Sequence, residues 1–299
     1  MTQKEVDFGN NSILPISEFK LSSMCIDPSI VMIAKRGSGK SVLCRTILKH
    51  FKYIPVGMII APTDKINNFY GSCFPELYVH YGFKSEIIEK LLHRQELIIE
   101  KSIRHKNLNP GAFIVMDDCL AKKRSWMKDE QITELLYNGR HYKITYILTM
   151  QYPLGITPDL RCNFDYIFLL AEDLLTNQKK MYEHYAGMFP NLNSFKAAFS
   201  VLTENHGCMV IVNRGARKEF RDKVFWYKAE DKECPRNVIG CRQFWKFNEN
   251  NYNINWKKKD KRFNIDECVA KTKKAGGTLK VEKIGEDDNK PKRKALNCL

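Results

Sequence analysis

The segment AKRGSGKS at residues 34–41 has the residue types and spacing that bind phosphate. It matches the pattern G-x-x-x-x-G-K-[ST] at its last three positions, and alanine occupies the position of the first glycine. Phosphate oxygens need several backbone N–H groups directed into one concavity, and glycine lets the backbone approach without a Cβ. We therefore expect a phosphate-binding loop formed by Ala34, Lys35, Arg36, Gly37, Ser38, Gly39, Lys40, Ser41 and Val42.

Two residues of this loop are expected to act on a bound triphosphate. Lys40 would reach the β- and γ-phosphates, and the Ser41 hydroxyl would bind Mg²⁺. The alternative is a chance Gly-Lys-Ser turn. The flanks favour phosphate binding, because the apolar run 29–33 predicts a buried strand and the apolar spacing over 41–51 predicts a helix.

A pair of acids ends the apolar run AFIVMDD at residues 112–118. A strand of this kind delivers its acids to the sheet edge where open α/β sheets bind ligands. Asp117 is expected to hold Mg²⁺ through water, because Mg²⁺ keeps part of its hydration shell. Asp118 is expected to polarise the attacking water, and the alternative is that it caps a following turn.

A polar residue follows the next predicted strand, ITYILTM at 144–150. If this strand neighbours the one that ends in Asp117, Gln151 or Thr149 would face the γ-phosphate and orient water. The alternative for Gln151 is an ordinary turn residue.

Two arginines are candidates for an arginine finger that reaches the γ-phosphate of a neighbouring subunit in a ring. Arg140 ends a predicted helix, and Arg161 precedes the apolar run 164–170. The alternative for each is a surface salt bridge or a cation at a helix C-terminus. The guanine-reading motif N-K-x-D and the kinase loop G-x-G-x-x-G are both missing, so we take ATP as the nucleotide.

The elements that must position these residues alternate along the chain. Apolar strands are predicted at 29–33, 56–62, 112–118, 144–150 and 164–170, with two late strands at 208–212 and 224–227. Helices are predicted at 41–51, 84–106, 128–140, 174–185 and 192–199. Strands that alternate with helices predict an α/β fold, with a mostly parallel central sheet covered by helices on both faces.

The chain has 299 residues and a net charge of +15, and 43% of its residues are hydrophobic, which excludes wholesale disorder. Residues 256–299 carry a surplus of +7, and the predicted division is an arm at 1–27, an ATPase domain at 28–245 and a basic, largely disordered tail at 246–299. The ten cysteines form no CxxC pair, which favours buried thiols over a metal site. We expect no membrane segment and no secretory signal, and therefore an intracellular setting.

The order of AKRGSGKS, FIVMDD, ILTMQ, LRCNFDYIF and VFWYKA, over about residues 28–230, resembles the virion DNA-packaging ATPases of nucleocytoplasmic large DNA viruses, poxvirus type. These belong to the FtsK/HerA superfamily of P-loop ATPases. The resemblance implies a RecA/FtsK-HerA-like fold and an ATP-driven motor that translocates double-stranded viral DNA into the capsid. It also implies a homo-oligomeric ring, possible capsid or portal partners, and a location in the host cytoplasm (virus factory) or the virion.

The same resemblance implies that Lys40, Ser41, Asp117, Asp118 and Gln151 form the ATP site, with a finger arginine supplied in trans. The sequence departs from the expected pattern at Ala34, where the first glycine stands, and at Asp118, where many members of the superfamily carry glutamate. No nuclease motif of the kind found in large terminases is evident, so DNA cleavage is not expected.

Basic segments fit a protein that grips phosphates without reading sequence. They lie at 101–106, 122–124 and 213–223, and each alone could be a solvated face. Two other functions stay open: a cellular-type FtsK/HerA-like DNA translocase, and a nucleotide-binding switch or scaffold without productive turnover.

Overall fold

The structure is a computed structural model that describes residues 3–7, 13–119, 129–216, 219–232 and 234–254. One compact unit, Met1–Tyr252, holds all of the helices and strands reported below. The predicted basic segment 122–124 and the basic tail at 256–299 lie outside the described residues, as do two residues of the segment 213–223.

The central sheet has eight strands in the order β10-β9-β8-β3-β7-β6-β4-β5. All neighbours from β8 to β5 pair in parallel, whereas β9 pairs antiparallel with both β8 and β10. The mostly parallel sheet predicted from the sequence is therefore confirmed. The strands are β3 (Ser29–Ile33), β4 (Val56–Ile60), β5 (Val79–His80), β6 (Ala112–Asp117), β7 (Ile144–Met150), β8 (Tyr166–Leu170), β9 (Gly207–Val212) and β10 (Val224–Lys228).

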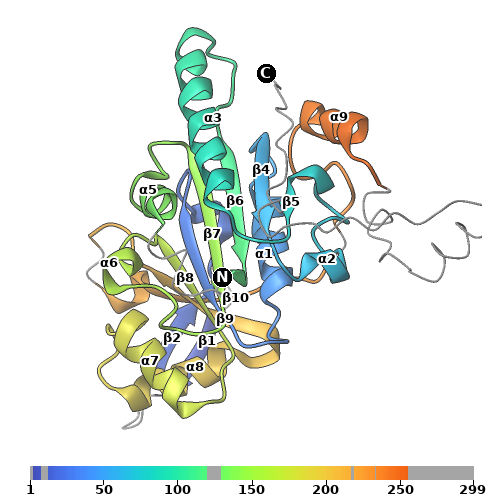
Figure 1. Ribbon diagram of the computed structural model, residues 1–299. Helices are drawn as coiled ribbons and strands as arrows, with labels where there is room; N and C mark the ends of the chain where they lie inside the picture. Colours follow the sequence, from blue (N-terminus) through green and yellow to red (C-terminus); the bar gives the residue numbers. More distant parts are fainter. Residues whose placement is uncertain (1–2, 8–12, 120–128, 217–218, 233, 255–299) are drawn as a thin grey trace, which may run out of the picture. The chain divides into compact units, whose positions relative to one another are not determined.

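Helices cover both faces of this sheet (Figure 1). On one face α3, α5, α7 and α8 contribute to a core with one set of strand side chains, and on the other face α1 and α9 pack against the alternate set. Covering both faces explains why the central strands read as continuous apolar runs. The helices are α1 (Lys40–His50), α2 (Asp64–Asn67), α3 (Ser85–Arg104), α5 (Glu130–Asn138), α6 (Pro158–Arg161), α7 (Leu175–Tyr185), α8 (Leu192–Leu202) and α9 (Arg242–Asn251).

The first residues differ from the predicted arm at 1–27. They form a hairpin of β1 (Gln3–Asp7) and β2 (Ile13–Ser17), which contributes fully buried Val6 and nearly buried Ile16 to the core beside α8. Each strand supplies only one deeply buried apolar side chain. Such a sparse pattern gives the sequence little periodicity to reveal a packed hairpin.

The predicted domain end at residue 245 also differs from the structure, because it falls inside α9. Phe244, Trp245 and Asn248 of this helix are buried, and Asn248 Oδ1 accepts a hydrogen bond of 2.9 Å from the Leu77 amide. Residues 246–251 therefore belong to the folded unit rather than to the tail. Within the described part of the chain, no helix has the length and apolar character needed to cross a membrane.

Candidate active site

The loop between β3 and α1 has the backbone shape that its glycines predict. Gly37 and Gly39 have φ angles of +76° and +93°, a region that L side chains rarely adopt. The Ser38 hydroxyl donates a hydrogen bond of 2.7 Å to the Lys35 carbonyl and closes the turn. Helix α1 begins at Lys40, so the unpaired N–H groups and positive dipole end of the helix lie at this loop.

Ala34 stands where the phosphate-binding pattern has its first glycine, and its surroundings explain why alanine is tolerated. The residue is fully buried in the core on the α1 face of the sheet. Its amide donates a hydrogen bond of 3.0 Å to the Met150 carbonyl, which extends the pairing of β3 with β7. A small apolar side chain therefore fits at this position.

The strand order brings the predicted acids beside this loop. Strand β7 lies between β3 and β6, so the carboxyl ends of the three strands meet at one sheet edge. Lys40 Nζ lies 3.1 Å from Asp117 Oδ1, and the Thr149 hydroxyl donates a hydrogen bond to the same oxygen. Asp117 is only 3% exposed, so this cation and this hydroxyl compensate a buried carboxylate.

Tyr70 is a further partner of Asp117 that the sequence did not predict. Its hydroxyl donates a hydrogen bond of 2.9 Å to Asp117 Oδ2. Burial, together with the neighbouring Asp117 carboxylate, raises the pKa of Tyr70 well above its usual range, so the phenol stays protonated and can donate. The Tyr70 amide is held by buried Asp64 at 2.7 Å. Tyr70 lies in an irregular segment with no periodic pattern, which explains why it was missed.

Asp118 and Gln151 meet at the same edge, as the sequence predicts for neighbouring strands. The Gln151 side-chain amide donates a hydrogen bond to Asp118 Oδ2, and the Asp118 backbone N–H donates one of 3.1 Å to the Thr149 hydroxyl. Asp118 has a φ of +53°, which is uncommon outside glycine and costs of order 1–3 kcal/mol. Strained backbone of this kind is concentrated at functional sites.

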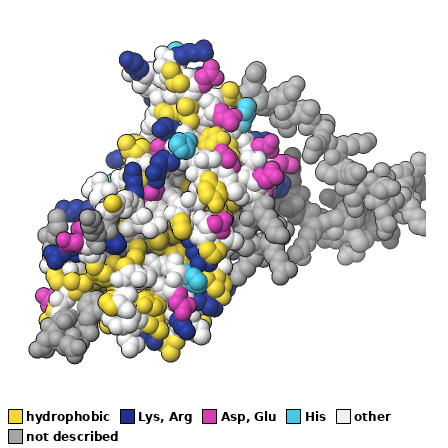
Figure 2. Space-filling view, turned by 90° about the vertical axis from the view of Figure 1, so that its left-hand side faces the viewer, with side chains coloured by type: hydrophobic (Ala, Val, Ile, Leu, Met, Phe, Trp, Pro, Cys, Tyr) yellow, Lys and Arg dark blue, Asp and Glu magenta, His cyan; other side chains and the backbone are white. Residues whose placement is uncertain are grey.

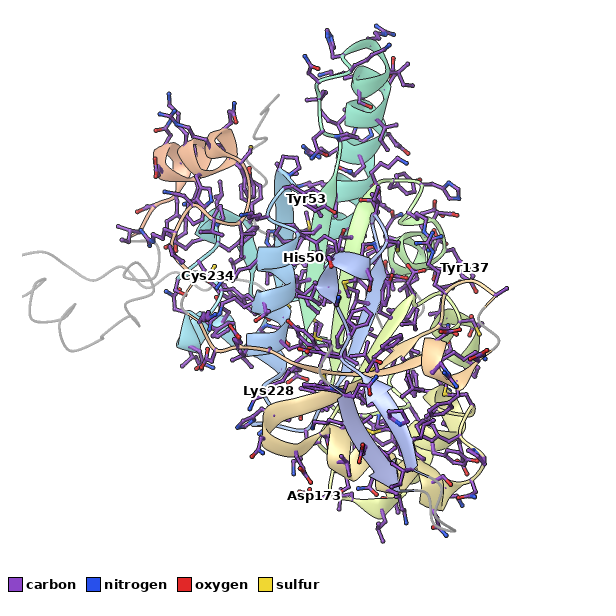
Figure 3. All side chains as sticks on the ribbon, turned by 180° about the vertical axis from the view of Figure 1, so that it is seen from behind. His50, Tyr53, Tyr137, Asp173, Lys228 and Cys234 are labelled. Carbon is purple, nitrogen blue, oxygen red and sulfur yellow. The ribbon has the colours of Figure 1, made fainter. Side chains whose placement is uncertain are left out.

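These groups surround a cavity of about 490 Å³, within the range of small-molecule sites. Ala34 and Ser38 are buried and do not line the cavity, whereas Thr63 and Asn67, which the sequence did not predict, do. Lys35 forms an ion pair with Asp173, which lies on the loop after β8 and is labelled in Figure 3. The other lining residues are Arg36, Gly37, Gly39, Lys40, Ser41, Val42, Asp117, Asp118 and Gln151.

The donor set in this cavity fits Mg²⁺. The cation prefers oxygen ligands and keeps several of its waters. The Ser41 hydroxyl and the Asp117 carboxylate supply such oxygens, and both residues line the cavity beside the start of α1. Both oxygens of Asp117 already accept hydrogen bonds, which favours contact through metal-bound water.

Neither candidate finger arginine lines the cavity of its own chain. Arg140 forms an ion pair with Asp165 Oδ1 at 2.6 Å, at the sheet edge opposite the phosphate-binding loop, and this hydrogen bond raises the pKa of Arg140. Arg161 Nε donates a hydrogen bond of 3.0 Å to the Ile156 carbonyl, and its guanidinium lies 5.7 Å from the Tyr185 ring centre. Both arginines thus have structural partners, and the finger role stays a prediction.

Several viral proteins are similar to this chain. An uncharacterized protein of Acanthamoeba polyphaga mimivirus is 48% identical over 248 residues, which cover 82% of this chain and 86% of that protein. An uncharacterized protein of Invertebrate iridescent virus 6 is 34% identical over 231 residues, which cover 77% and 88%. Among solved structures, the genome packaging NTPase B204 from Sulfolobus turreted icosahedral virus 2, in complex with AMPPCP, matches 69% of this chain and 100% of its own at 14% identity and a TM-score of 0.48.

A family model assigns the chain directly. The model of the poxvirus A32 protein matches residues 16–185, which is more than half of the chain and includes the loop, both acids, Gln151 and both candidate arginines. The chain therefore belongs to the poxvirus A32 protein family, which confirms the resemblance to poxvirus-type packaging ATPases that its sequence motifs indicate.

Proposed function

We propose that this protein is an ATPase motor that moves double-stranded DNA into a viral capsid during virion assembly. The observation that carries the proposal is one cavity in which a phosphate-binding loop, a buried acid, a second acid and a glutamine converge. Membership of the poxvirus A32 protein family supports a role in packaging rather than in cellular DNA segregation.

The side chains would divide the work of hydrolysis. Backbone N–H groups of the loop bind the phosphates, and Lys40 moves its charge from Asp117 to the β- and γ-phosphates. Mg²⁺, held by Ser41 and through water by Asp117, would neutralise charge between the phosphates. Asp118 accepts a hydrogen bond from the attacking water and so polarises it. Gln151 holds the Asp118 carboxylate in place by its own hydrogen bond.

Basic segments lie away from this chemistry. Helix α3 leads toward the start of β6, and the segment 213–223 follows the end of β9; both strand ends are at the sheet edge opposite the loop. Lys101 and Arg104 lie in the last turn of α3 and Lys106 follows it, and all three are exposed. Figure 2 shows Lys and Arg side chains at the top of the molecule. We propose that these segments contact DNA phosphates, which would separate DNA binding from ATP hydrolysis by the length of the strands.

A ring is part of the proposal, with Arg140 or Arg161 completing the site of a neighbouring subunit. Both lie outside the phosphate cavity of their own chain, so either could act there only on the site of a neighbouring subunit. The test mixes Lys40→Ala subunits with Arg140→Gln or Arg161→Gln subunits. ATPase activity that reappears only in the mixture identifies a finger acting in trans, and activity that the arginine variants keep alone contradicts it.

The decisive experiment measures ATP hydrolysis with and without double-stranded DNA. We expect the wild-type rate of ATP hydrolysis to rise when DNA is added. We expect Lys40→Ala and Asp118→Asn to abolish ATP hydrolysis with or without DNA. Lys52→Ala is the matched control, because Lys52 is exposed just beyond the end of α1. A wild-type rate equal to that of Lys40→Ala would refute the motor. Tight ATP binding without phosphate release would instead indicate a nucleotide switch.

A further inference from the structure

The thiols of Cys73 and Cys234 meet in the fold although they lie far apart in the sequence. A hydrogen bond joins the two side chains. Cys73 lies in the irregular segment after α2 and belongs to the core on the α1 face of the sheet. Cys234, labelled in Figure 3, lies after β10 and packs against the same core. Cys73 is only 1% exposed and Cys234 is half-buried, so one thiol is enclosed and the other is open to small reagents.

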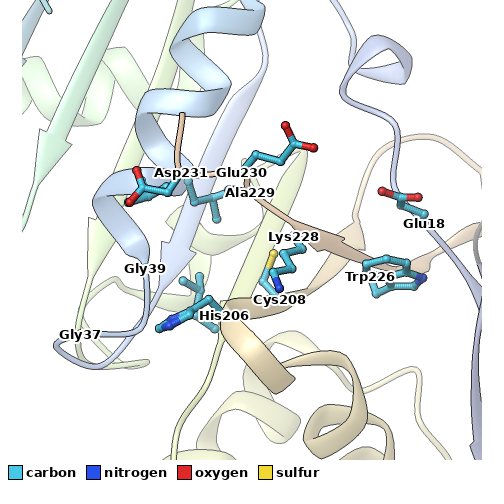
Figure 4. Close-up of a pocket in the computed structure, with 13 residues that line it drawn as sticks. Glu18, Gly37, Gly39, His206, Cys208, Trp226, Lys228, Ala229, Glu230 and Asp231 are labelled. Carbon is cyan, nitrogen blue, oxygen red and sulfur yellow. The ribbon is translucent and has the colours of Figure 1, made fainter. Parts of the chain in front are cut away.

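An arginine of α1 contacts both segments that carry these thiols. The Arg45 guanidinium lies 4.7 Å from the centre of the Phe69 ring and donates a hydrogen bond of 2.7 Å to Asp231 Oδ1. The Phe69 carbonyl accepts a hydrogen bond of 3.9 Å from the Cys73 thiol. Figure 4 shows Asp231 beside α1, on the segment that continues from β10 toward Cys234. The contact between the two thiols is therefore supported by neighbours on both sides.

The surroundings of Cys234 favour its thiolate form. The hydrogen bond from Cys73, with the charges of Lys49 and Arg45, outweighs the effect of partial burial and lowers the pKa of Cys234 to about 7. The same hydrogen bond, together with burial, raises the pKa of Cys73, so Cys73 keeps its proton and donates it. The thiolate is the nucleophilic form of cysteine. Cys234 is thus the nucleophile of the pair, and Cys73 is a second thiol within its reach.

Other buried cysteines have a different environment. Burial raises the pKa of the Cys44, Cys119 and Cys208 thiols. The last two of these donate hydrogen bonds to backbone carbonyls, at 3.0 and 3.3 Å. They are the packed, unreactive thiols that the sequence predicts. The pair instead combines an accessible thiolate with an adjacent thiol, which is the usual arrangement of cysteines that sense oxidants.

We propose that Cys234 and Cys73 form a redox site, which a peroxide oxidises to a disulfide and a dithiol reduces again. The Cys234 thiolate attacks one oxygen of hydrogen peroxide and breaks the O–O bond, and with one proton this gives a sulfenic acid and water. The Cys73 thiol then loses its proton, and its sulfur displaces the hydroxyl of the sulfenic acid as a second water. Each sulfur loses one electron, and the peroxide gains two.

The disulfide would join two segments that flank the phosphate site. Cys73 follows Tyr70 by three positions, and the Tyr70 hydroxyl contacts Asp117. Cys234 follows Asp231 by three positions, and Asp231 is held by α1. A link between distant parts of the chain lowers the entropy of the unfolded state, and thiols already in contact need little distortion to form it. The oxidised protein is therefore more stable, and this inference does not depend on ATP hydrolysis.

The test is peptide mapping by mass spectrometry after treatment with hydrogen peroxide. Trypsin cuts after lysine and arginine, so the peptides 66–84 and 233–236 carry Cys73 and Cys234 as their only cysteines. We expect the two peptides to be linked in the oxidised protein and separated by dithiothreitol. The link should be lost in Cys234→Ser. Cys241→Ser is the matched control and should keep it, because Cys241 is also half-buried against the same core.

A second measurement uses the wild-type protein alone, so a variant that folds poorly does not affect it. The urea midpoint of the oxidised protein should exceed that of the reduced protein by about 0.5 M or more. A Cys234 that peroxide leaves unlinked, or links to a cysteine other than Cys73, overturns the redox site. A link that leaves the midpoint unchanged or lowers it also overturns the site, because such a link would form only in a distorted chain.

Discussion

The hydroxyl of Tyr70 offers a direct test of how the buried acid is held. Tyr70→Phe removes one oxygen and keeps the ring that packs in the core. That oxygen lies 2.9 Å from Asp117 Oδ2, and the exposed fractions of the two residues are 2% and 3%. The substitution therefore leaves a buried carboxylate oxygen without its donor, while Lys40 and Thr149 still contact the other oxygen.

The size of the effect follows from the charge of the acceptor. A hydrogen bond to a charged group contributes about 1.5–3 kcal/mol, which corresponds to about 10- to 150-fold in an equilibrium constant. We expect the free energy of unfolding to fall within this range. We also expect ATP hydrolysis to need more Mg²⁺ for half-maximal rate, because Asp117 loses the contact that fixes its orientation.

Urea denaturation and an ATPase titration with Mg²⁺ measure the two quantities. Tyr146→Phe is the matched control, since Tyr146 is also fully buried but its hydroxyl donates only to the Met116 sulfur, at 3.5 Å. That variant should be close to wild type in both assays. Equal effects of the two substitutions would refute the reasoning, because only one of the hydroxyls touches the acid.

Three further predictions concern other parts of the molecule. Gly37→Ala should weaken ATP binding by about tenfold in calorimetry, because alanine is strained at the φ of +76° that the phosphate-binding loop has at this residue. A steric clash is not the cause, since nothing lies within 4 Å of the added Cβ. Unchanged affinity contradicts this prediction. Arg140→Gln should lower the free energy of unfolding in urea by only about 1 kcal/mol, since the Ser29 amide still donates to Asp165, and a loss above about 3 kcal/mol would contradict this. Burial, with the charges of Lys84 and Lys90, lowers the pKa of His80 in the folded protein. As the pH falls, the unfolded chain therefore binds this proton at a higher pH than the folded protein does. Stability should fall as pH drops through about 6.5, and less steeply in His80→Gln when urea midpoints are compared.

The central strands and the loop were predictable because local signals and tertiary structure agree. Residues 29–33 and 144–150 are apolar throughout, and both strands are buried on both faces of the sheet. The pattern AKRGSGKS places glycines where the structure has positive φ angles. Asp117 and Gln151 could be predicted to meet because acids and amides at the carboxyl ends of neighbouring parallel strands share one edge.

Other features depend on contacts that no local pattern encodes. Tyr70 and Asp117 are 47 positions apart, and Tyr70 lies in a loop held by Asp64. The hairpin at 3–7 and 13–17 is stable because it packs on α8, not because its own residues are strongly apolar. A cavity of about 590 Å³ on the other side of the loop likewise combines α1 with residues beyond 200, whose place beside the loop follows only from the sheet order.

The resemblance to the superfamily leads us to expect glutamate at position 118, but aspartate agrees better with the backbone there. Asp118 directly follows β6 with a φ of +53°, a conformation that aspartate and asparagine adopt several times more readily than most residues. The left-handed turn brings the Asp118 amide to Thr149 and its carboxylate to Gln151. A carboxylate that is one methylene shorter is thus fixed from two sides at the cavity. The chain turns sharply at this residue, and the turn holds the shorter side chain at the cavity.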